Sequence, residues 1–432
     1  MNRNKQKIKV FKYDFSILRK NKLKKIKLVD TTNKKAKWSF TGGPFGSNLQ
    51  SSDYTESGIR VIQLQNIGDG FFNDNYKIFT SEEKANELLS CNIYPNEIII
   101  SKMGDPVGRA CIVPNFEKRY IMCSDGIRIV VDETKYSKTY IYYAINSPSF
   151  RLKIFRNSTG STRRRIGLDV LKNLEMLILK EKKDQEQIAG CLKTLDDLIL
   201  LEERKLEQLK IYKKGILQRL YPPKDKNTPE LRFPKFNQKW KKNKLKEICI
   251  FKNGGSYENN ISKSGKYDLI TLNSIDIEGN LKDKHHTVDY GEWYLCKNDI
   301  VMILSDVATG KFLGLSAIIP KNDKYVLNQR VGLLRVHKDK SANFIRYFIN
   351  QNQKYFMSHG QGANQKNLSK EDVLSFCLML PIDIKEQQKI AECISSIDDL
   401  ISAQTEKIKA LQQHKKGLLQ GLFPSIEEVK NE

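Results

Sequence analysis

The chain has 432 residues, enough for two ordinary domains with connectors, and 39% of them are hydrophobic, which permits buried cores. A formal net charge of +24 favours a nucleic-acid partner, although a composition rich in Lys, Asn and Ile would also raise it. Eight cysteines without a C-x-x-C pair argue against structural zinc and against a disulfide framework. No apolar run approaches the ~18 residues of a membrane span, so we expect a cytoplasmic protein with reduced cysteines.

The first 180 residues are expected to form a mixed α/β-type domain with a basic N-terminal segment. Met1 to Leu28 is rich in Lys and has no apolar core, so it does not resemble a secretory signal. Short β-branched runs between Gly, Asn and Pro loops predict strands, and two other stretches predict helices. The expected strands are 59–64, 98–101 and 127–131, and the expected helices are 81–89 and 139–145.

Two glycine-containing loops of this domain carry cations, which suits contacts with DNA phosphates and base edges. The candidate contacts are Thr159, Ser161, Arg163 and Arg164 in the loop 159–165, and Arg109 in the loop 104–109. An arginine fork can bond a guanine edge. A solvated basic turn would have the same sequence, so that interpretation stays open.

A long helix is predicted for residues 181–222, where apolar residues recur in a 4-3-4-3 pattern and the helix stops at Pro222. The seam consists of Ile188, Leu192, Leu195, Ile199, Glu202, Leu206, Leu209, Lys213, Ile216 and Leu220. Leu198, Leu201 and Leu217 lie outside the seam. A pair of helices would leave them uncovered, so we expect another protein to cover them.

Four prolines within residues 222–234 predict a linker, which we place at 223–240. A second mixed domain is expected at 241–383, with strands at 269–272, 300–304 and 331–336 and a helix at 343–350. Its candidate DNA contacts are Lys311, Arg330, Asn364, Gln365 and Lys366. Asn and Gln can bond adenine through two hydrogen bonds.

A second long helix, predicted at 384–424 before a short tail at 425–432, repeats the first. Residues 187–222 and 389–424 match without gaps at an offset of 202, with 16 of 36 positions identical. The second seam consists of Ile390, Ile394, Ile397, Ile401, Gln404, Ile408, Leu411, Lys415, Leu418 and Leu422, and Leu400 and Leu419 lie outside it.

The repeat extends faintly upstream. Residues 97–101 parallel 299–303, and Gly160 parallels Gly362, at the same offset. Residues 22–26 parallel 244–248 at an offset of 222, which implies about 20 extra residues in the first copy. The chain is therefore expected to be two tandem units, each a mixed domain followed by a long helix.

Several motifs occur in a family-specific order. Each long helix begins with a Glu/Gln-Gln motif that ends in Ile-Ala (Glu-Gln-Ile-Ala at 186–189 and Gln-Gln-Lys-Ile-Ala at 387–391), continues with Asp-Asp-Leu-Ile and ends with Lys-Lys-Gly. The linker reads Pro-Glu-Leu-Arg-Phe-Pro-x-Phe-x-x-x-Trp from Pro229 to Trp240. Over nearly its whole length the chain resembles the specificity subunits of type I restriction–modification systems.

This resemblance implies an α+β fold with two target-recognition domains and an antiparallel coiled coil of the two helices with pseudo-two-fold symmetry. Each recognition domain would read one half of an interrupted, asymmetric site in double-stranded DNA. The helices would dock two modification (methyltransferase) subunits, and two restriction subunits would join the complex. S-adenosylmethionine would bind the modification subunit, so this chain would hold no cofactor, no metal and no catalytic residue.

Catalytic motifs are not evident in the sequence itself. Residues 40–44 begin like a methyl-donor loop but place Pro44 at the second glycine, and residues 146–150 only faintly resemble the catalytic motif of adenine methyltransferases. We interpret both as turns, and the pair His285-His286 as a solvated loop. No Walker A sequence is present.

Two other classes of protein remain open at this point. A stand-alone DNA-binding architectural protein would share the charge and the helices but would not need a partner on the apolar positions. A fused restriction–modification enzyme would require the methyltransferase and nuclease motifs that we did not find.

Overall fold

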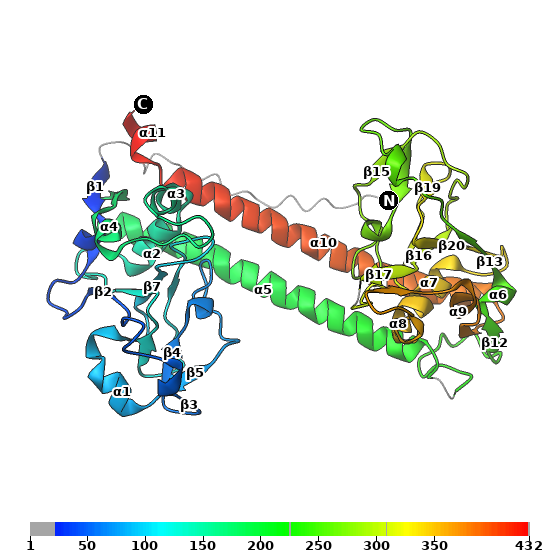
Figure 1. The fold of residues 1–432 in the computed structure, drawn as a ribbon, viewed down its shortest axis with the longest axis horizontal. Helices are drawn as coiled ribbons and strands as arrows, with labels where there is room; N and C mark the ends of the chain where they lie inside the picture. The colour runs from blue at the N-terminus through cyan, green and yellow to red at the C-terminus, as the bar shows by residue number, and fades with distance from the viewer. Residues whose placement is uncertain (1–21, 224–225, 308, 431–432) are drawn as a thin grey trace. The chain divides into compact units, whose positions relative to one another are not determined.

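The computed structural model describes residues 22–223, 226–307 and 309–430, and Figure 1 shows its elements. Most of the basic N-terminal segment lies outside these residues. The chain forms two compact units: unit 1 contains the residues up to Glu202 and those from Lys407 onward, and unit 2 is Glu203–Glu406. The boundary therefore cuts both long helices, and each unit combines one mixed domain with half of each helix.

The described residues of unit 1 form three sheets. An antiparallel four-stranded sheet has the order β2-β10-β7-β8, a five-stranded sheet has the order β3-β5-β4-β9-β6 with β4 and β9 parallel, and β1 pairs with β11. The strands are β1 Leu23–Lys27, β2 Phe40–Gly42, β3 Tyr54–Thr55, β4 Ile59–Ile62, β5 Ile78–Thr80, β6 Asn92–Ile93, β7 Ile98–Ser101, β8 Ala110–Ile112, β9 Tyr120–Met122, β10 Gly126–Ile129 and β11 Glu175–Leu179. The helices are α1 Glu82–Glu87, α2 Lys138–Asn146, α3 Pro148–Arg156, α4 Leu168–Asn173 and α11 Ile426–Lys430.

Unit 2 repeats part of this plan. Its antiparallel four-stranded sheet has the order β13-β20-β16-β18, a three-stranded sheet has the order β15-β14-β19, and β12 pairs with β22 and β17 with β21. The strands are β12 Lys241–Lys244, β13 Cys249–Asn253, β14 Tyr267–Ile270, β15 His286–Val288, β16 Ile300–Ile303, β17 Ser305–Val307, β18 Ser316–Ile318, β19 Tyr325–Leu327, β20 Val331–Val336, β21 Gln365–Asn367 and β22 Cys377–Leu380. The helices are α6 Leu245–Ile248, α7 Ala342–Gln351, α8 Gln353–His359 and α9 Lys370–Leu374.

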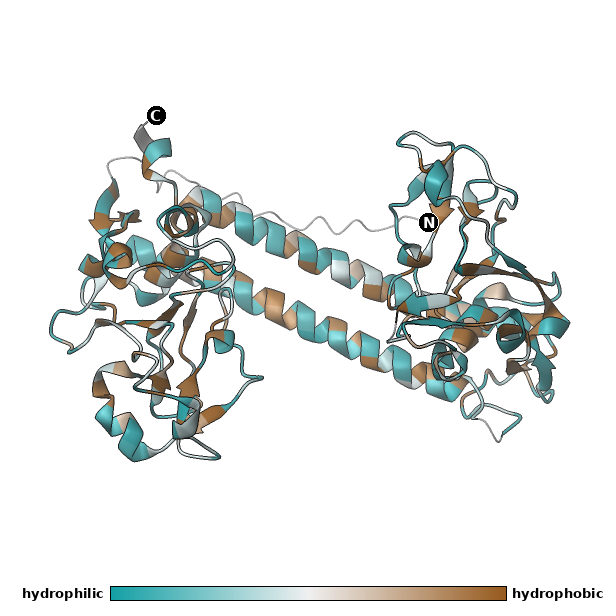
Figure 2. Ribbon diagram, viewed as in Figure 1, coloured by the Kyte–Doolittle hydropathy of each residue, from teal (hydrophilic) through white to brown (hydrophobic). Residues whose placement is uncertain are grey.

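The long helices are α5, Lys182–Leu220, and α10, Ile384–Leu422. Both contain the predicted seam, and none of the seam side chains is exposed. Figure 2 shows apolar and polar residues alternating along both helices. In unit 1, Ile188 and Leu192 of α5 share a core with Leu418 and Leu422 of α10, which extends over β7, β10 and α2. Burying such a side chain stabilises the fold by about 1.5–3 kcal/mol, so these halves of the helices belong to the core.

In unit 2 the core joins Leu220 of α5 with Ile390 and Ile394 of α10. The start of one helix therefore lies against the end of the other in each unit, which is an antiparallel arrangement. A buried glutamine fastens each mixed domain to the start of its helix: Gln185 accepts from the Ser137 N–H at 2.9 Å, and Gln387 accepts from the Ser341 N–H at 2.9 Å. Gln387 is the first residue of the motif at which the second helix begins, and Gln185 immediately precedes the motif of the first helix.

The linker motif is explained by a cluster in unit 2. Arg232 donates to both carboxylate oxygens of Glu386, at 2.7 and 2.9 Å, and the Trp240 indole N–H donates to the same group at 3.3 Å. Glu386 is only 1% exposed, and a buried carboxylate needs such partners. The contacts of Arg232 and Trp240 with Glu386 thus hold the linker against the start of α10.

The predicted offset at the start of the units was wrong. Leu28 donates its N–H to Leu174, and Leu245 donates its N–H to Phe376, so Leu28 and Leu245 are equivalent and the offset is 217 rather than 222. The similar alternation of Lys and apolar residues in the two segments had matched strand β1 to the short helix α6.

All eight cysteines are free, and burial raises the pKa of the Cys111 and Cys249 thiols to about 12.

Candidate nucleic-acid interface

The loop of unit 1 that carries three consecutive arginines is closed by a backbone bridge. Thr159 and Arg165 exchange N–H···O bonds of 2.9 and 2.8 Å. Gly160 starts the turn at φ +98°, where a Cβ atom would lie 2.9 Å from the Arg163 carbonyl oxygen. Only glycine takes this conformation without strain, so the sequence dictates a tight loop whose tip is made of the residues 161–164.

The three arginines have different surroundings. Arg163 is exposed and forms no ion pair with any residue in the described part of the chain. Arg164 is half-buried with its guanidinium 3.9 Å from the centre of the Phe155 ring, and Arg165 pairs with Asp125 at 2.7 Å. Thr159 and Ser161 are exposed. Sequence reasoning missed both partners: Asp125 is 40 residues from Arg165, and Phe155, nine residues before Arg164, lies outside the loop on α3.

Arg109 lies next to this loop but is not displayed at its tip. The Gly104 N–H donates to the Arg164 carbonyl at 3.1 Å, which joins the two loops. Arg109 is half-buried, its Nη2 lies 3.5 Å from the Leu64 carbonyl, and its Nε is buried without a hydrogen-bond partner. Neighbouring Arg151 donates to the Gly108 carbonyl at 2.8 Å, and burial lowers its pKa. Arg109 was expected to be a free contact on a loop, but the domain holds its side chain half-buried.

Unit 2 builds the same loop from different side chains. Gln361 and Asn367 form the equivalent bridge, and Gly362 turns at φ +115°. The pairing of β17 with β21 anchors the loop, and the Ser305 hydroxyl donates to the Asn367 side chain at 2.7 Å. Asn364 is exposed, whereas Gln365 and Lys366 are half-buried.

Lys311 occupies a longer loop than Arg109 does. Gly108 and Gly314 are equivalent, because both have a positive φ and face α3 and α8 at Ile154 and Phe356. Residues 102–107 therefore correspond to 304–313, an insertion that exposes Lys311. Arg330 is exposed at φ +70°, and its carbonyl accepts from the Leu304 N–H at 2.9 Å. The structure thus brings all the predicted contacts of unit 2 to one end of β16 and β20.

These two loop clusters differ chemically. The cluster of unit 1 offers guanidinium forks, which match phosphate and guanine, and the cluster of unit 2 adds amides, which match adenine. Both clusters sit on bridged backbone at the same edge of equivalent sheets. Such a rigid base suits side chains that must meet a groove in a fixed position.

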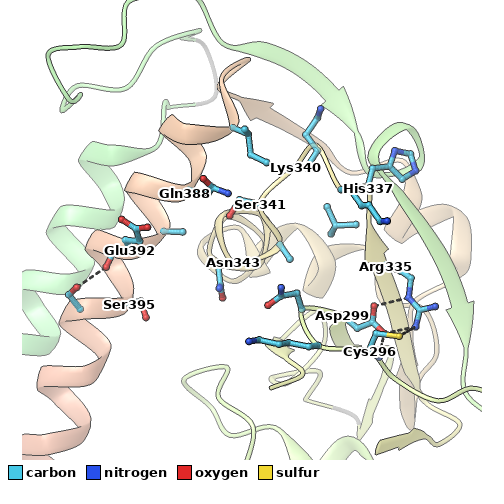
Figure 3. A pocket seen from close by; sticks show the side chains of 18 residues that line it. Cys296, Asp299, Arg335, His337, Lys340, Ser341, Asn343, Gln388, Glu392 and Ser395 are labelled. Atoms are coloured by element: carbon cyan, nitrogen blue, oxygen red, sulfur yellow. Dashed lines mark hydrogen bonds and ion pairs between the residues drawn. The ribbon is translucent and has the colours of Figure 1, made fainter. Parts of the chain in front are cut away.

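A cleft of about 990 Å³ lies at the opposite end of β20 (Figure 3). It is lined by Lys297, Lys338 and Lys340 and by the start of α10, including Gln388 and Glu392. The Arg335 guanidinium in its wall is bound to Asp299 at 2.7 and 2.9 Å. Sequence reasoning did not find this cleft, since its lysines come from two separate loops. It is separate from the candidate DNA loops of the same unit.

The apolar positions outside the seam fall into two groups. Leu198, Leu201 and Leu400 are 38%, 61% and 57% exposed, as expected for side chains that another protein would cover. Leu217 and Leu419 were expected to be uncovered too, but they are half-buried against the cores of their own units. The mixed domain of the same unit covers each of them, because they lie near the helix ends where the domains pack.

Two segments interpreted as turns are regular structure. Phe40–Gly42 is strand β2, and Asn146 ends α2 while the Ser147 hydroxyl caps α3. The histidine pair is not a solvated loop: His286 begins β15, and burial lowers the pKa of half-buried His285.

Within residues 22–223, 226–307 and 309–430, no group of three His, Cys, Asp or Glu residues is placed to hold a metal ion. In the same residues, no helix has the length and the apolar content that a membrane span requires.

Comparison with known proteins defines the class. The fold matches a solved S subunit of a type I restriction–modification system from M. genitalium, with a TM-score of 0.58 at 16% identity over 94% of this chain and 96% of that one. A structure described as the basis of complex assembly and conformational transition of the type I R-M system gives the same TM-score at 11% identity, over 93% and 97% of the two chains.

A family model, the type I restriction modification DNA specificity domain, matches residues 60–211 and 237–413. The chain therefore belongs to the type I restriction modification DNA specificity family. The type I restriction enzyme MjaVIII specificity subunit of Methanocaldococcus jannaschii is 22% identical over 178 residues, which is 40% of this chain and 42% of that relative. The putative MjaX specificity subunit of the same organism is 20% identical over 396 residues, covering 86% of this chain and 88% of the relative.

Proposed function

We propose that this chain recognises a bipartite, asymmetric site in double-stranded DNA and brings methyltransferase subunits to it. The domains at 1–180 and 241–383 are the two target-recognition domains, and the helix segments 181–222 and 384–424, joined through the linker 223–240, form the scaffold. The observation that carries this proposal is the duplicated bridged loop, because the same backbone presents arginines in one unit and amides in the other.

The contacts with DNA come from Arg163, Arg164, Thr159 and Ser161 in the first domain and from the loops of Lys311, Arg330 and 364–366 in the second. Arg109 contributes charge from within the first domain. The sequences of these loops differ, so the two half-sites differ and the whole site is asymmetric.

Two modification subunits bind the scaffold, with Leu198, Leu201 and Leu400 as contacts, and two restriction subunits join them in the cytoplasm. The modification subunits supply S-adenosylmethionine and the catalytic residues. A stand-alone architectural DNA-binding protein would not explain the exposed leucines, because without a partner protein these side chains would remain in contact with water.

Reconstitution tests the proposal. The purified chain with its modification subunit should transfer labelled methyl groups from S-adenosylmethionine to one interrupted DNA sequence, and either protein alone should not. Methyl transfer by the isolated chain would contradict it. Binding of DNA without sequence preference, and without assembly with the modification subunit, would favour the architectural protein.

A further inference from the structure

Each unit contains one cluster in which three elements meet at a carboxylate. In unit 1, Asp196 of α5 accepts from the Tyr143 hydroxyl of α2 at 2.8 Å through Oδ2 and pairs with Lys415 of α10 at 2.5 Å through Oδ1. The mixed domain and both helices are therefore tied at a single side chain.

Unit 2 repeats this cluster atom for atom. Asp398 of α10 accepts from the Tyr347 hydroxyl of α7 at 2.6 Å through Oδ2 and pairs with Lys213 of α5 at 2.6 Å through Oδ1. In both units the lysine Nζ also lies 5.8 Å from the tyrosine ring centre. These residues are the first Asp of each Asp-Asp-Leu motif and the first Lys of each Lys-Lys-Gly motif, so the strongest repeat in the sequence encodes this contact.

The clusters can select one register of the helices, which the apolar seam alone cannot. A seam with a heptad-like pattern allows the helices to slide by seven residues and still meet. Such a slide would place Asp196 opposite Ile408 or Leu422 instead of Lys415. Both of these side chains are buried, and a carboxylate without a partner is costly there.

The clusters also fix the recognition domain on the helices. Both oxygens of the aspartate are engaged, so its side chain cannot rotate without losing a charge-assisted bond. Burial, followed by the nearby aspartate, raises the pKa of Tyr143, which favours the protonated hydroxyl that donates to Asp196.

We propose that Tyr143, Asp196 and Lys415, with their counterparts Tyr347, Asp398 and Lys213, are the positioning residues that set the spacing between the two DNA half-sites. This inference rests on the proposed function. The chain offers a matched control: Tyr142, next to Tyr143 on α2, donates its hydroxyl to the Gly70 carbonyl at 2.6 Å inside the mixed domain and is not bonded to the helices.

The test sequences the methylated sites in cells that make the full-length chain with its modification subunit. Tyr143→Phe and Asp196→Lys should raise the share of sites with a second spacer length about tenfold, and both half-site sequences should persist. Tyr142→Phe should keep the single wild-type spacer. Asp196→Lys combined with Lys415→Asp should restore it, because the pair is rebuilt with its charges exchanged. A single unchanged spacer in all variants would overturn the proposal.

A second measurement on the purified chain separates this inference from the proposed function. Spin labels on non-natural residues at positions 193 and 416 report the register of the helices in unit 1. Wild type and Tyr142→Phe should give one distance, and Asp196→Lys should add a second one, because a slide of seven residues moves one helix along the other by about 10 Å. An unchanged single distance refutes register setting even where methylation is normal. A shifted distance in a chain that directs no methylation supports it while the proposed function fails.

Discussion

The loop clusters of the two units share a backbone and differ in side chains. Gly160 and Gly362 turn in the same way, and the bridges Thr159–Arg165 and Gln361–Asn367 occupy the same place. Yet one loop carries three arginines, and the other carries Asn364, Gln365 and Lys366. At the other end of each domain the opposite holds, since the contacts with the helices are repeated atom for atom. The two units thus share their contacts with the helices and differ in the loops for which we propose contacts with DNA.

The largest effect is expected when the difference between the two loop clusters is removed by building the protein from two copies of its first half. A fragment that ends at Pro223 lacks Leu418, Leu422 and Phe423, which belong to the core of unit 1. A second copy can supply Ile216, Leu220 and Tyr221 at the equivalent positions. The fragment should therefore dimerise and, with its modification subunit, methylate a palindrome of the first half-site.

Analytical ultracentrifugation and sequencing of methylated sites measure these outcomes. Leu220→Asp in the fragment is the control and should keep it monomeric. A monomeric parent fragment, or one that still marks the asymmetric site, would show that the two units are not interchangeable.

The loops themselves provide the next comparison. Arg163→Ala with Arg164→Ala should weaken DNA binding about 10–100-fold and lower the salt dependence by about one per lost phosphate contact. Gln365→Ala should instead cost about 1–3 kcal/mol of discrimination at one half-site and leave the salt slope unchanged.

Titrations of both half-sites at several salt concentrations separate these effects. Lys338→Ala in the cleft serves as the control, because the cleft lies at the far end of β20 from the loops. If the arginine variant kept its affinity and its slope, the loop of unit 1 would not contact DNA.

The anchors at the start of the two helices should differ in strength. Arg232→Ala leaves the buried Glu386 with a lost charge partner and should cost about 3 kcal/mol of unfolding free energy. Asp184→Ala in unit 1 removes a partly exposed pair with Lys22, at 3.6 Å, and should cost under about 1 kcal/mol. Pulsed thiol alkylation in denaturant distinguishes the units, since Cys249 reports on unit 2 and Cys111 on unit 1. If Cys111 and Cys249 were labelled equally in Arg232→Ala, the contact between Arg232 and Glu386 would not stabilise unit 2 in particular.

The smallest expected effect separates the exposed leucines from the half-buried ones. Leu201→Asp should weaken assembly with the modification subunit about tenfold and leave the melting temperature unchanged. Leu217→Asp should lower the melting temperature, because it lies against the core of unit 2. Calorimetry and co-purification measure the two results. If the Leu217→Asp variant kept the wild-type melting temperature, Leu217 would belong with the exposed leucines that we expect a partner to cover.

The periodicity and the internal repeat of the sequence determined the long helices, their equivalence and several strands. The seam gave both long helices, the offset of 202 gave their equivalence, and β-branched runs gave β7 and β20 with their exact bounds. Spacing between repeated motifs also located the loops at Gly160 and Gly362. These features follow from local rules, because side-chain period and glycine conformation act over a few residues.

Only the tertiary structure decided which cations are displayed and which are held. Arg165 is neutralised by Asp125, Arg164 lies on Phe155, and Arg109 is drawn inside, whereas Arg163 stays free of ion pairs with the described residues. The same holds for Leu217, which is covered by the domain that follows it in the chain, and for Leu419, which is covered by the first domain, far upstream. Each of these outcomes depends on residues outside the loop or helix segment concerned, and the local sequence pattern does not encode which of those side chains will make the contact.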